Sequence, residues 1–256
     1  MSGLFSMRTL LVAFSLVGLL VPEAAALQVE DVNGVLPEGG NGERMTTAVE
    51  IAVLLTVLSL LPAVLITITS FTRIVIVLSF VRRALSVNEL PPNPVVMGLA
   101  LFLTMFVMAP VGTRIYEEAW EPYKAGDLSA EDASGEAWAE LSTFLVANTR
   151  EGELALFADM AQVQQVEEEG GKLELPMRVI VPAFVLSELK TAFQMGFLLF
   201  LPFLVIDLVV SSILLSMGMF MLPPVMISTP FKILIFVLVD GWHLICEALV
   251  TSFITT

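Results

Sequence analysis

The chain has 256 residues, of which 57% are hydrophobic and 15% are charged. Soluble domains carry about a quarter charged residues, whereas this sequence repeats apolar runs of about 20 residues, the length that crosses a bilayer, so its composition indicates an integral membrane protein. The net charge of −14 argues against a nucleic acid partner, and the single cysteine, Cys246, excludes an intrachain disulfide framework.

The first 26 residues have the three parts of a secretory signal peptide. Arg8 supplies the positive charge, Leu10–Val21 the apolar stretch, and Ala24 to Ala26 the small residues of a cleavage site. The alternative is an uncleaved first membrane anchor, but the apolar run is short for a span. We therefore predict a cleavable signal peptide over 1–26, followed by a flexible periplasmic lead-in over 27–47 that is acidic and rich in glycine.

The next segment, 48–111, predicts a first helical hairpin. Its two spans are expected at Ala48–Thr69, with a kink at Pro62, and at Pro94–Val111. The linker between them is basic and holds Arg73, Arg82 and Arg83. Cytoplasmic loops carry an excess of Lys and Arg, and a cleaved signal peptide leaves the new N-terminus outside. Both arguments place the linker in the cytoplasm.

The second span returns to the outside, which puts the acidic segment 112–178 in the periplasm. This segment holds fifteen Asp or Glu residues against five Lys or Arg residues, a net charge of −10. Trp138, Leu141 and Leu145 recur at helical spacing, as do Leu154, Phe157 and Ala161. We expect two short amphipathic helices that pack on each other or on a neighbour. The run Glu167–Gly171 is typical of a solvated turn.

Residues 179–256 predict a second helical hairpin. One helix from Val179 to Met217 would have 39 residues and a length of about 58 Å, whereas the hydrocarbon core of a bilayer is about 30 Å thick. The helix must therefore bend, most simply at Pro202, or leave the membrane. The last helix is expected over Phe231–Thr251.

Between these helices lies the stretch SMGMFMLPP, Ser216–Pro224. In a continued helix, Met217 and Met221 would share a face while Met219 pointed nearly the opposite way. Gly218 permits a non-helical backbone, and the two prolines that follow stop a helix from resuming at once. The stretch therefore predicts a methionine-rich loop. Taken by themselves, its methionines suit core packing or contact with lipid as well as a role in function.

Ionisable residues are costly in a bilayer and need partners there. Those in or beside the apolar runs are Glu188, Lys190, Asp207, Lys232, Asp240 and Glu247. Glu188 and Lys190 lie about 200° apart around a helix, so they cannot pair with each other. Lys232 is a candidate partner for Glu188 or Asp207, within the chain or across a subunit boundary. Two roles stay open for these groups: packing pairs, or a proton or ion relay.

Asp240, His243 and Glu247 align on one helix face through spacings of three and four. That face suits a polar contact with a partner, or a metal or proton site. A di-metal bundle needs several carboxylate–histidine sets, and the chain has one histidine, so we predict no metal. The sequence contains no nucleophile elbow, phosphate-binding glycine loop or metalloprotease motif. We therefore expect neither a cofactor nor an enzymatic activity.

Three stretches together resemble a known family: TSFTRIVIVLSFVRRAL, PPNPVVMGLALFLTMFVMAP, and the run from Val181 to Trp242 that contains SELKTAFQ and SMGMFMLPP. They resemble the signatures of the FliP/SctR family, the export-gate membrane proteins of type III secretion. FTRI, SELKTAFQ and a cleavable signal peptide are more similar to flagellar members than to virulence-system relatives. The resemblance covers Ala48–Phe253, and the acidic middle is its least family-like part.

The resemblance implies an all-α, polytopic membrane protein of two kinked helical hairpins with an acidic, partly helical periplasmic segment. Such subunits form a homo-oligomer, pentameric in the family, and assemble with FliQ and FliR, and with FlhB and FlhA as further partners, into a helical channel complex. That complex belongs to the flagellar basal body in the bacterial inner membrane and conducts unfolded flagellar export substrates. Its helices are strongly tilted, and much of the assembly lies above the membrane plane.

The resemblance also implies roles for particular residues. Met217, Met219 and Met221 match a loop that forms a gasket narrowing the channel, and Glu188 and Lys232 match charged positions that pair between neighbouring subunits. Two other functions compete with a channel subunit. One is an ion- or proton-coupled secondary transporter that uses intramembrane polar groups, for which Lys190, Asp207 and Asp240 are further candidates. The other is a structural scaffold that recruits export components.

Overall fold

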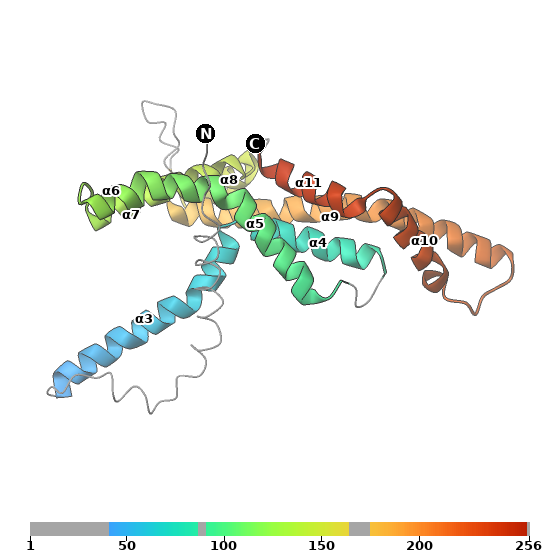
Figure 1. The fold of residues 1–256 in the computed structure, drawn as a ribbon, viewed down its shortest axis with the longest axis horizontal. Helices are drawn as coiled ribbons and strands as arrows, with labels where there is room; N and C mark the ends of the chain where they lie inside the picture. The colour runs from blue at the N-terminus through green and yellow to red at the C-terminus, as the bar shows by residue number, and fades with distance from the viewer. Residues whose placement is uncertain (1–40, 87–90, 164–174, 255–256) are drawn as a thin grey trace. The chain divides into compact units, whose positions relative to one another are not determined.

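A computed structural model describes residues 41–86, 91–163 and 175–254, and every regular element within these ranges is helical (Figure 1). The chain divides into two units, residues 1–62 and residues 63–256. The signal peptide, most of the lead-in and the predicted turn at Glu167–Gly171 lie outside the described residues. The all-helical class expected from the sequence is confirmed for the part that the structure describes.

The first helix, α3 (Asn41–Thr67), continues through Pro62. It begins within the segment predicted to be a flexible lead-in, so residues 41–47 are helical instead. Its apolar residues are not confined to one stripe, which is typical of a helix surrounded by apolar material on all sides. Val53, Leu54 and Val57 are each more than half exposed, as expected of a helix that lipid or other subunits cover.

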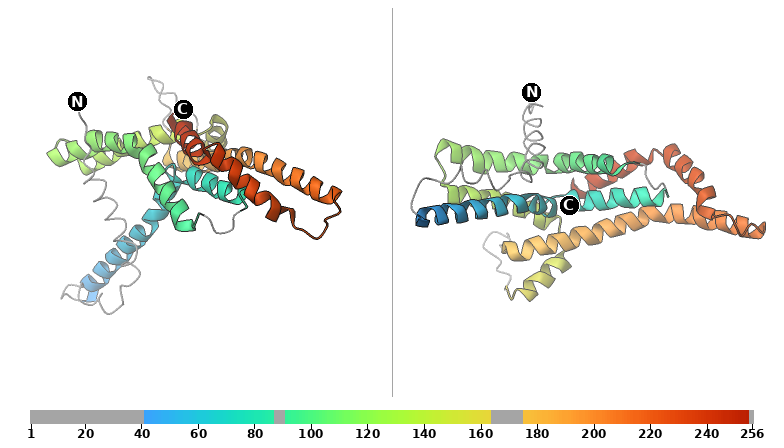
Figure 2. Two further views of the ribbon diagram at one scale, coloured as in Figure 1. Left: turned by 45° about the vertical axis from the view of Figure 1, so that its right-hand side comes forward. Right: turned by 90° about the horizontal axis from the view of Figure 1, so that it is seen from below.

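The second helix, α4 (Phe71–Ala84), lies where the sequence predicted a basic, partly apolar linker between two spans. Its buried apolar residues recur every three or four positions: Phe71, Ile74, Val77, Leu78, Val81 and Ala84. This spacing gives one apolar helix face. That face packs against α9 and α5, and α4 lies alongside α9 in each view (Figures 1 and 2). The linker is thus the centre of the core of the second unit.

The acidic segment continues directly from the second predicted span. Helix α5 (Asn93–Ile115) passes through a π-helical turn, η1 (Tyr116–Trp120), into α6 (Glu121–Ala125), which ends at Gly126 with a φ of 87°. Ser129 then caps α7 (Ala130–Ala147) by accepting a hydrogen bond from the Asp132 amide at 3.2 Å. The two expected amphipathic helices are confirmed as α7 and α8 (Glu151–Met160), which pack against η1 and α9 respectively.

Helix α9 (Met177–Ser216) is a single helix of 40 residues that passes through Pro182 and Pro202. Its length of about 60 Å is twice the hydrocarbon thickness of a bilayer. Because the helix does not break at Pro202, part of it must extend beyond the hydrocarbon core or lie at a steep tilt. Along its sides pack α4, α8 and α10, so α9 is the element that positions most of the charged residues singled out above.

The prediction of one last helix over Phe231–Thr251 is wrong. The structure forms α10 (Pro224–Leu238) and α11 (Gly241–Ile254), which are bent by 63° at a short break. Asp240 lies in this break with a φ of 51°, a left-handed conformation that Asp tolerates better than most residues. Gly241 follows it, where a side chain would collide with the Phe236 ring. Among the residues that the structure describes, two helices are long and apolar enough to cross a membrane, or up to four if each bent pair is one span.

Candidate functional site

The methionine-rich loop joins α9 to α10 and consists of residues 217–223. Helix α9 ends in a Schellman arrangement in which the amide of Gly218 donates to the Leu215 carbonyl at 3.0 Å and the amide of Met219 donates to the Leu214 carbonyl at 3.0 Å. Gly218 has a φ of 73°, which residues with a Cβ rarely adopt. Pro224 begins the next helix in its first turn. The predicted departure from helical geometry is therefore present.

The large apolar side chains of this loop are exposed. The exposed fractions are 65% for Met217, 36% for Met219 and 96% for Met221, and Phe220 between them is also exposed. Five exposed large apolar residues, Met217 and the four from Met219 to Leu222, thus surround the turn at Gly218 at the tip where α9 ends (Figure 1). Such a tip is unfavourable in water, so it requires lipid or another protein chain as its covering.

Glu188 lies on α9 and is completely buried. It receives two hydrogen bonds from the Arg73 guanidinium of α4, one of them from Nε to Oε2 at 2.9 Å. Arg73 also donates to the Ser252 carbonyl and hydroxyl oxygens of α11 at 3.1 and 3.0 Å, and its guanidinium lies 3.8 Å from the centre of the Phe253 ring. This forked arrangement ties three helices together at one point.

Lys232 of α10 is the second buried charge and is 1% exposed. Its Nζ donates to Asp207 Oδ2 of α9 at 2.6 Å and to the Ser86 hydroxyl at 2.8 Å. The Ser228 hydroxyl donates to the other carboxylate oxygen of Asp207 at 2.5 Å. Of the two partners that the sequence offered for Lys232, the structure uses Asp207 within the chain. Glu188 and Lys232 do not contact each other in one copy, and their pairing between subunits stays a prediction.

The remaining predicted charges occupy separate places. Lys190 Nζ donates to Glu153 Oε1 of α8 at 3.0 Å, so Lys190 and Glu188 pair with different helices, as their spacing requires. Asp240 is exposed at the break before α11. His243 Nε2 lies 3.9 Å from Glu247 Oε2, and both side chains are largely exposed. Within the described residues no three His, Cys, Asp or Glu side chains are arranged to hold a metal ion.

The arginines at the end of α4 differ from Arg73. Arg82 Nη1 donates to the Asn93 side-chain oxygen at the start of α5, and Arg83 lies with its guanidinium 4.7 Å from the centre of the Phe80 ring. Neither takes part in an ion pair among the described residues. Their role in fixing the orientation of the chain stays a prediction.

The pairing of Arg73 was not predicted from the sequence, where Arg73 was assigned only as a cytoplasmic charge. The signal was available, because Arg73 precedes Val77 by four residues and therefore shares its helix face, and Val77 belongs to the apolar stripe of α4. An arginine beside a buried stripe requires an acidic partner, and Glu188, for which only Lys232 had been considered, is such an acid. No comparable pattern marks Ser86 or Ser252, whose contacts arise from tertiary packing.

The similarity of this chain to known proteins extends over most of its length. Residues 54–249 match the FliP family. The chain belongs to the FliP family. It is 52% identical over 211 residues to the flagellar biosynthetic protein FliP of Bacillus subtilis (strain 168), a match that covers 82% of this chain and 94% of the relative.

Two further FliP proteins show the same breadth of similarity. The protein from Pectobacterium carotovorum subsp. carotovorum is 51% identical over 218 residues, covering 85% of this chain and 83% of the relative. The protein from Caulobacter vibrioides (strain ATCC 19089 / CIP 103742 / CB 15) is 48% identical over 231 residues, covering 90% of this chain and 85% of the relative. The FliP match includes α4, α9, the methionine-rich loop and α10, so both buried ion pairs described above lie within it.

Proposed function

We propose that this chain is the core channel subunit of the flagellar type III protein export gate, and that it conducts unfolded flagellar substrates across the inner membrane. Family membership and the flagellar names of its relatives support a place in this apparatus. The observation that carries the proposal is the exposed methionine-rich loop at the turn between α9 and α10. It presents apolar side chains that one copy of the chain leaves uncovered.

Methionine suits a seal that must open for many sequences. Its side chain is unbranched and polarizable, so it packs against varied shapes. If several copies place Met217, Met219 and Met221 around one axis, their thioethers close the opening by apolar contact and exclude water. An unfolded chain can then displace them without breaking specific hydrogen bonds. We therefore assign these residues the role of a gasket that keeps ions from leaking through the pore between export events.

The proposed assembly is a homo-oligomer, pentameric by resemblance, with FliQ, FliR, FlhB and FlhA as partners. Its topology has two kinked helical hairpins whose tips face the cytoplasm, with the acidic segment 112–178 in the periplasm. The excess length of α9 and the break at Asp240 support tilted and kinked helices of this kind. The burial of only 11% of the most apolar window of α9 supports extensive cover by other subunits and lipid.

The alternative function is an ion- or proton-coupled secondary transporter. A helix broken at Asp240 supports it, because transporters build midplane sites at discontinuous helices. Against it, Asp207 is engaged by Lys232 and Ser228 and Lys190 is engaged by Glu153. These contacts leave Asp240 as the exposed intramembrane carboxylate candidate among the three.

One experiment separates the two functions. Alanine at Met217, Met219 and Met221 should raise the ion leak of cells expressing the protein while allowing part of the flagellar export, because shorter side chains no longer close the pore. The matched control replaces Met97, Met160 and Met177, which are also exposed but lie elsewhere, and should change neither quantity. Asp240→Asn should leave export intact.

The opposite pattern would contradict the channel proposal. A transporter predicts that the triple alanine variant conducts no additional ions and that Asp240→Asn stops transport. Blue native electrophoresis of both variants checks that assembly is preserved, so that loss of export is not confused with loss of the complex.

A further inference from the structure

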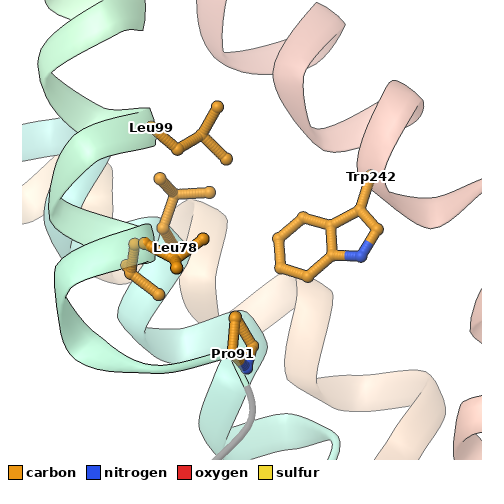
Figure 3. Close-up of a pocket in the computed structure, with 6 residues that line it drawn as sticks. Leu78, Pro91, Leu99 and Trp242 are labelled. Carbon is orange, nitrogen blue, oxygen red and sulfur yellow. The ribbon is translucent and has the colours of Figure 1, made fainter.

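An apolar crevice with a volume of about 280 Å³ lies between α4, α5 and α11. Its lining residues are Leu78, Pro91, Val95, Val96, Leu99 and Trp242. The indole ring of Trp242 stands across the crevice from Leu99 and Leu78, and Pro91 closes one end (Figure 3). Nothing in the proposed channel mechanism uses this crevice, which is on a different part of the chain from the methionine-rich loop.

A positive charge lies at the edge of the crevice. Arg82 follows the lining residue Leu78 by four positions on α4, so the two share a helix face. Its guanidinium is held by the Asn93 side-chain oxygen, and Asn93 lies between the lining residues Pro91 and Val95. The Asn93 amide is neutral, so this bond positions the guanidinium without cancelling its charge.

Helix α5, which lines the crevice with Val95, Val96 and Leu99, belongs to a candidate membrane span, and Val95 is itself an exposed apolar side chain. Trp242 is an amphipathic side chain of the type that gathers at the level of lipid headgroups. Apolar lining, an interfacial tryptophan and an arginine at one end correspond to the parts of a phospholipid: an acyl chain, the interface and a phosphate.

We propose that this crevice binds the acyl chain of an anionic phospholipid whose headgroup phosphate contacts Arg82. An acyl chain that enters the crevice moves from the bilayer interior to another apolar environment, so its burial contributes little binding free energy. The crevice by itself therefore does not distinguish one phospholipid from another. Selectivity must then come from the arginine. Basic pockets between membrane helices are known to select anionic headgroups on this principle. The proposal therefore expects discrimination between headgroups rather than between acyl chains.

The test uses the full-length protein purified in mild detergent with its assembly intact. Dioleoyl phosphatidylglycerol and dioleoyl phosphatidylcholine are added in competition, and the retained lipids are counted by native mass spectrometry. We expect a preference of about fivefold for phosphatidylglycerol, the effect of one arginine near a membrane surface. Arg82→Gln should remove this preference, while Arg178→Gln, which removes an exposed charge elsewhere, should retain it.

A second pair of variants tests the crevice. Val95→Trp should fill it and lower retention of both lipids, whereas Val205→Trp should not, because Val205 has a matching exposed fraction (56% against 57%) but lies on α9. The proposal is wrong if Arg82→Gln keeps the preference. It is also wrong if Val95→Trp leaves lipid retention unchanged. Dissociation of the assembly by that variant would show that a second copy of the chain occupies the crevice instead.

A spectroscopic measurement covers the case in which Val95→Trp does not fold. In a chain with Trp120→Phe and Trp138→Phe, Trp242 is the remaining tryptophan of three. Phosphatidylglycerol with brominated acyl chains should quench its fluorescence more strongly than the brominated phosphatidylcholine does. Arg82→Gln should equalise the two. Equal quenching by both lipids in the chain that retains Arg82 would overturn the proposal.

Discussion

Among the ion pairs described above, we expect the Arg73–Glu188 pair to have the largest effect on the stability of the protein when one partner is removed. Both side chains are buried, so removing one partner leaves the other as an uncompensated charge. We predict that Glu188→Gln destabilises the protein by about 3–5 kcal/mol, which should appear as a lower midpoint of thermal unfolding in detergent. Arg73→Gln should have a similar effect.

The control for this prediction is Glu140→Gln. Glu140 pairs with Arg114, whose side chain is 43% exposed, and exposed pairs of this kind contribute about 0–1 kcal/mol. A double-mutant cycle then identifies the true partner of Glu188. Coupling to Arg73 that is weaker than coupling to Lys232 would show that the pair across subunits, implied by the family resemblance, replaces the contact within the chain.

At the scale of elements, the close contact between α4 and α9 depends on Gly196. A Cβ at this position would lie 2.5–3.0 Å from the Phe80 side chain, including its Cβ, so α4 would have to move. We predict that Gly196→Ala destabilises the protein by about 1–3 kcal/mol through overpacking. The measurement is the detergent-resistant fraction of the assembled protein after heating.

Gly98 provides the matched control, because it also lies within a helix but a Cβ there would meet nothing within 4 Å. Gly98→Ala should stabilise the protein by about 0.5–1 kcal/mol by reducing backbone entropy in the unfolded chain. Equal effects of the two alanines would mean that α4 and α9 are not in close contact in the assembled protein.

The same elements show how far the sequence determined the fold. Composition and apolar runs were enough for the helical class, because about 20 apolar residues in sequence leave few other solutions in a membrane. Loop geometry at Gly218 also followed from local rules, since a glycine and two prolines act on their own backbone. These features need no knowledge of distant parts of the chain.

Other features depended on tertiary packing and were missed. Helix α4 was predicted as a basic, partly apolar linker because its 14 residues are too few to cross a bilayer, although its apolar residues have helical spacing. No proline in the sequence indicates the break at Asp240. It depends on the Phe236 ring, which packs against Trp242 with ring centres 5.3 Å apart, and on Gly241 beside it. The charged residues themselves could be identified from the sequence. Their partners on other helices could not, because tertiary packing decides which side chains meet.

At the scale of the whole molecule, the distribution of charge predicts the orientation in the membrane. Arg82 and Arg83 lie at the end of α4, and the acidic helices α7 and α8 follow the candidate span Asn93–Ala125. The positive-inside rule places the arginines in the cytoplasm, and one crossing by α5 then puts the acidic helices in the periplasm. This arrangement brings opposite net charges to the two sides of the membrane.

Cysteine labelling in intact cells tests this orientation. Cys246 is the single native cysteine, so Cys246→Ser gives an unlabelled background. In that background, Asp127→Cys, an exposed site after α6, should react with a membrane-impermeant maleimide added outside the inner membrane. Arg83→Cys should react only after the membrane is opened, because α5 separates the two sites. Labelling of Arg83→Cys in closed cells, with protection of Asp127→Cys, would show the opposite orientation. The methionine-rich loop would then face the opposite compartment from the one that the export proposal requires.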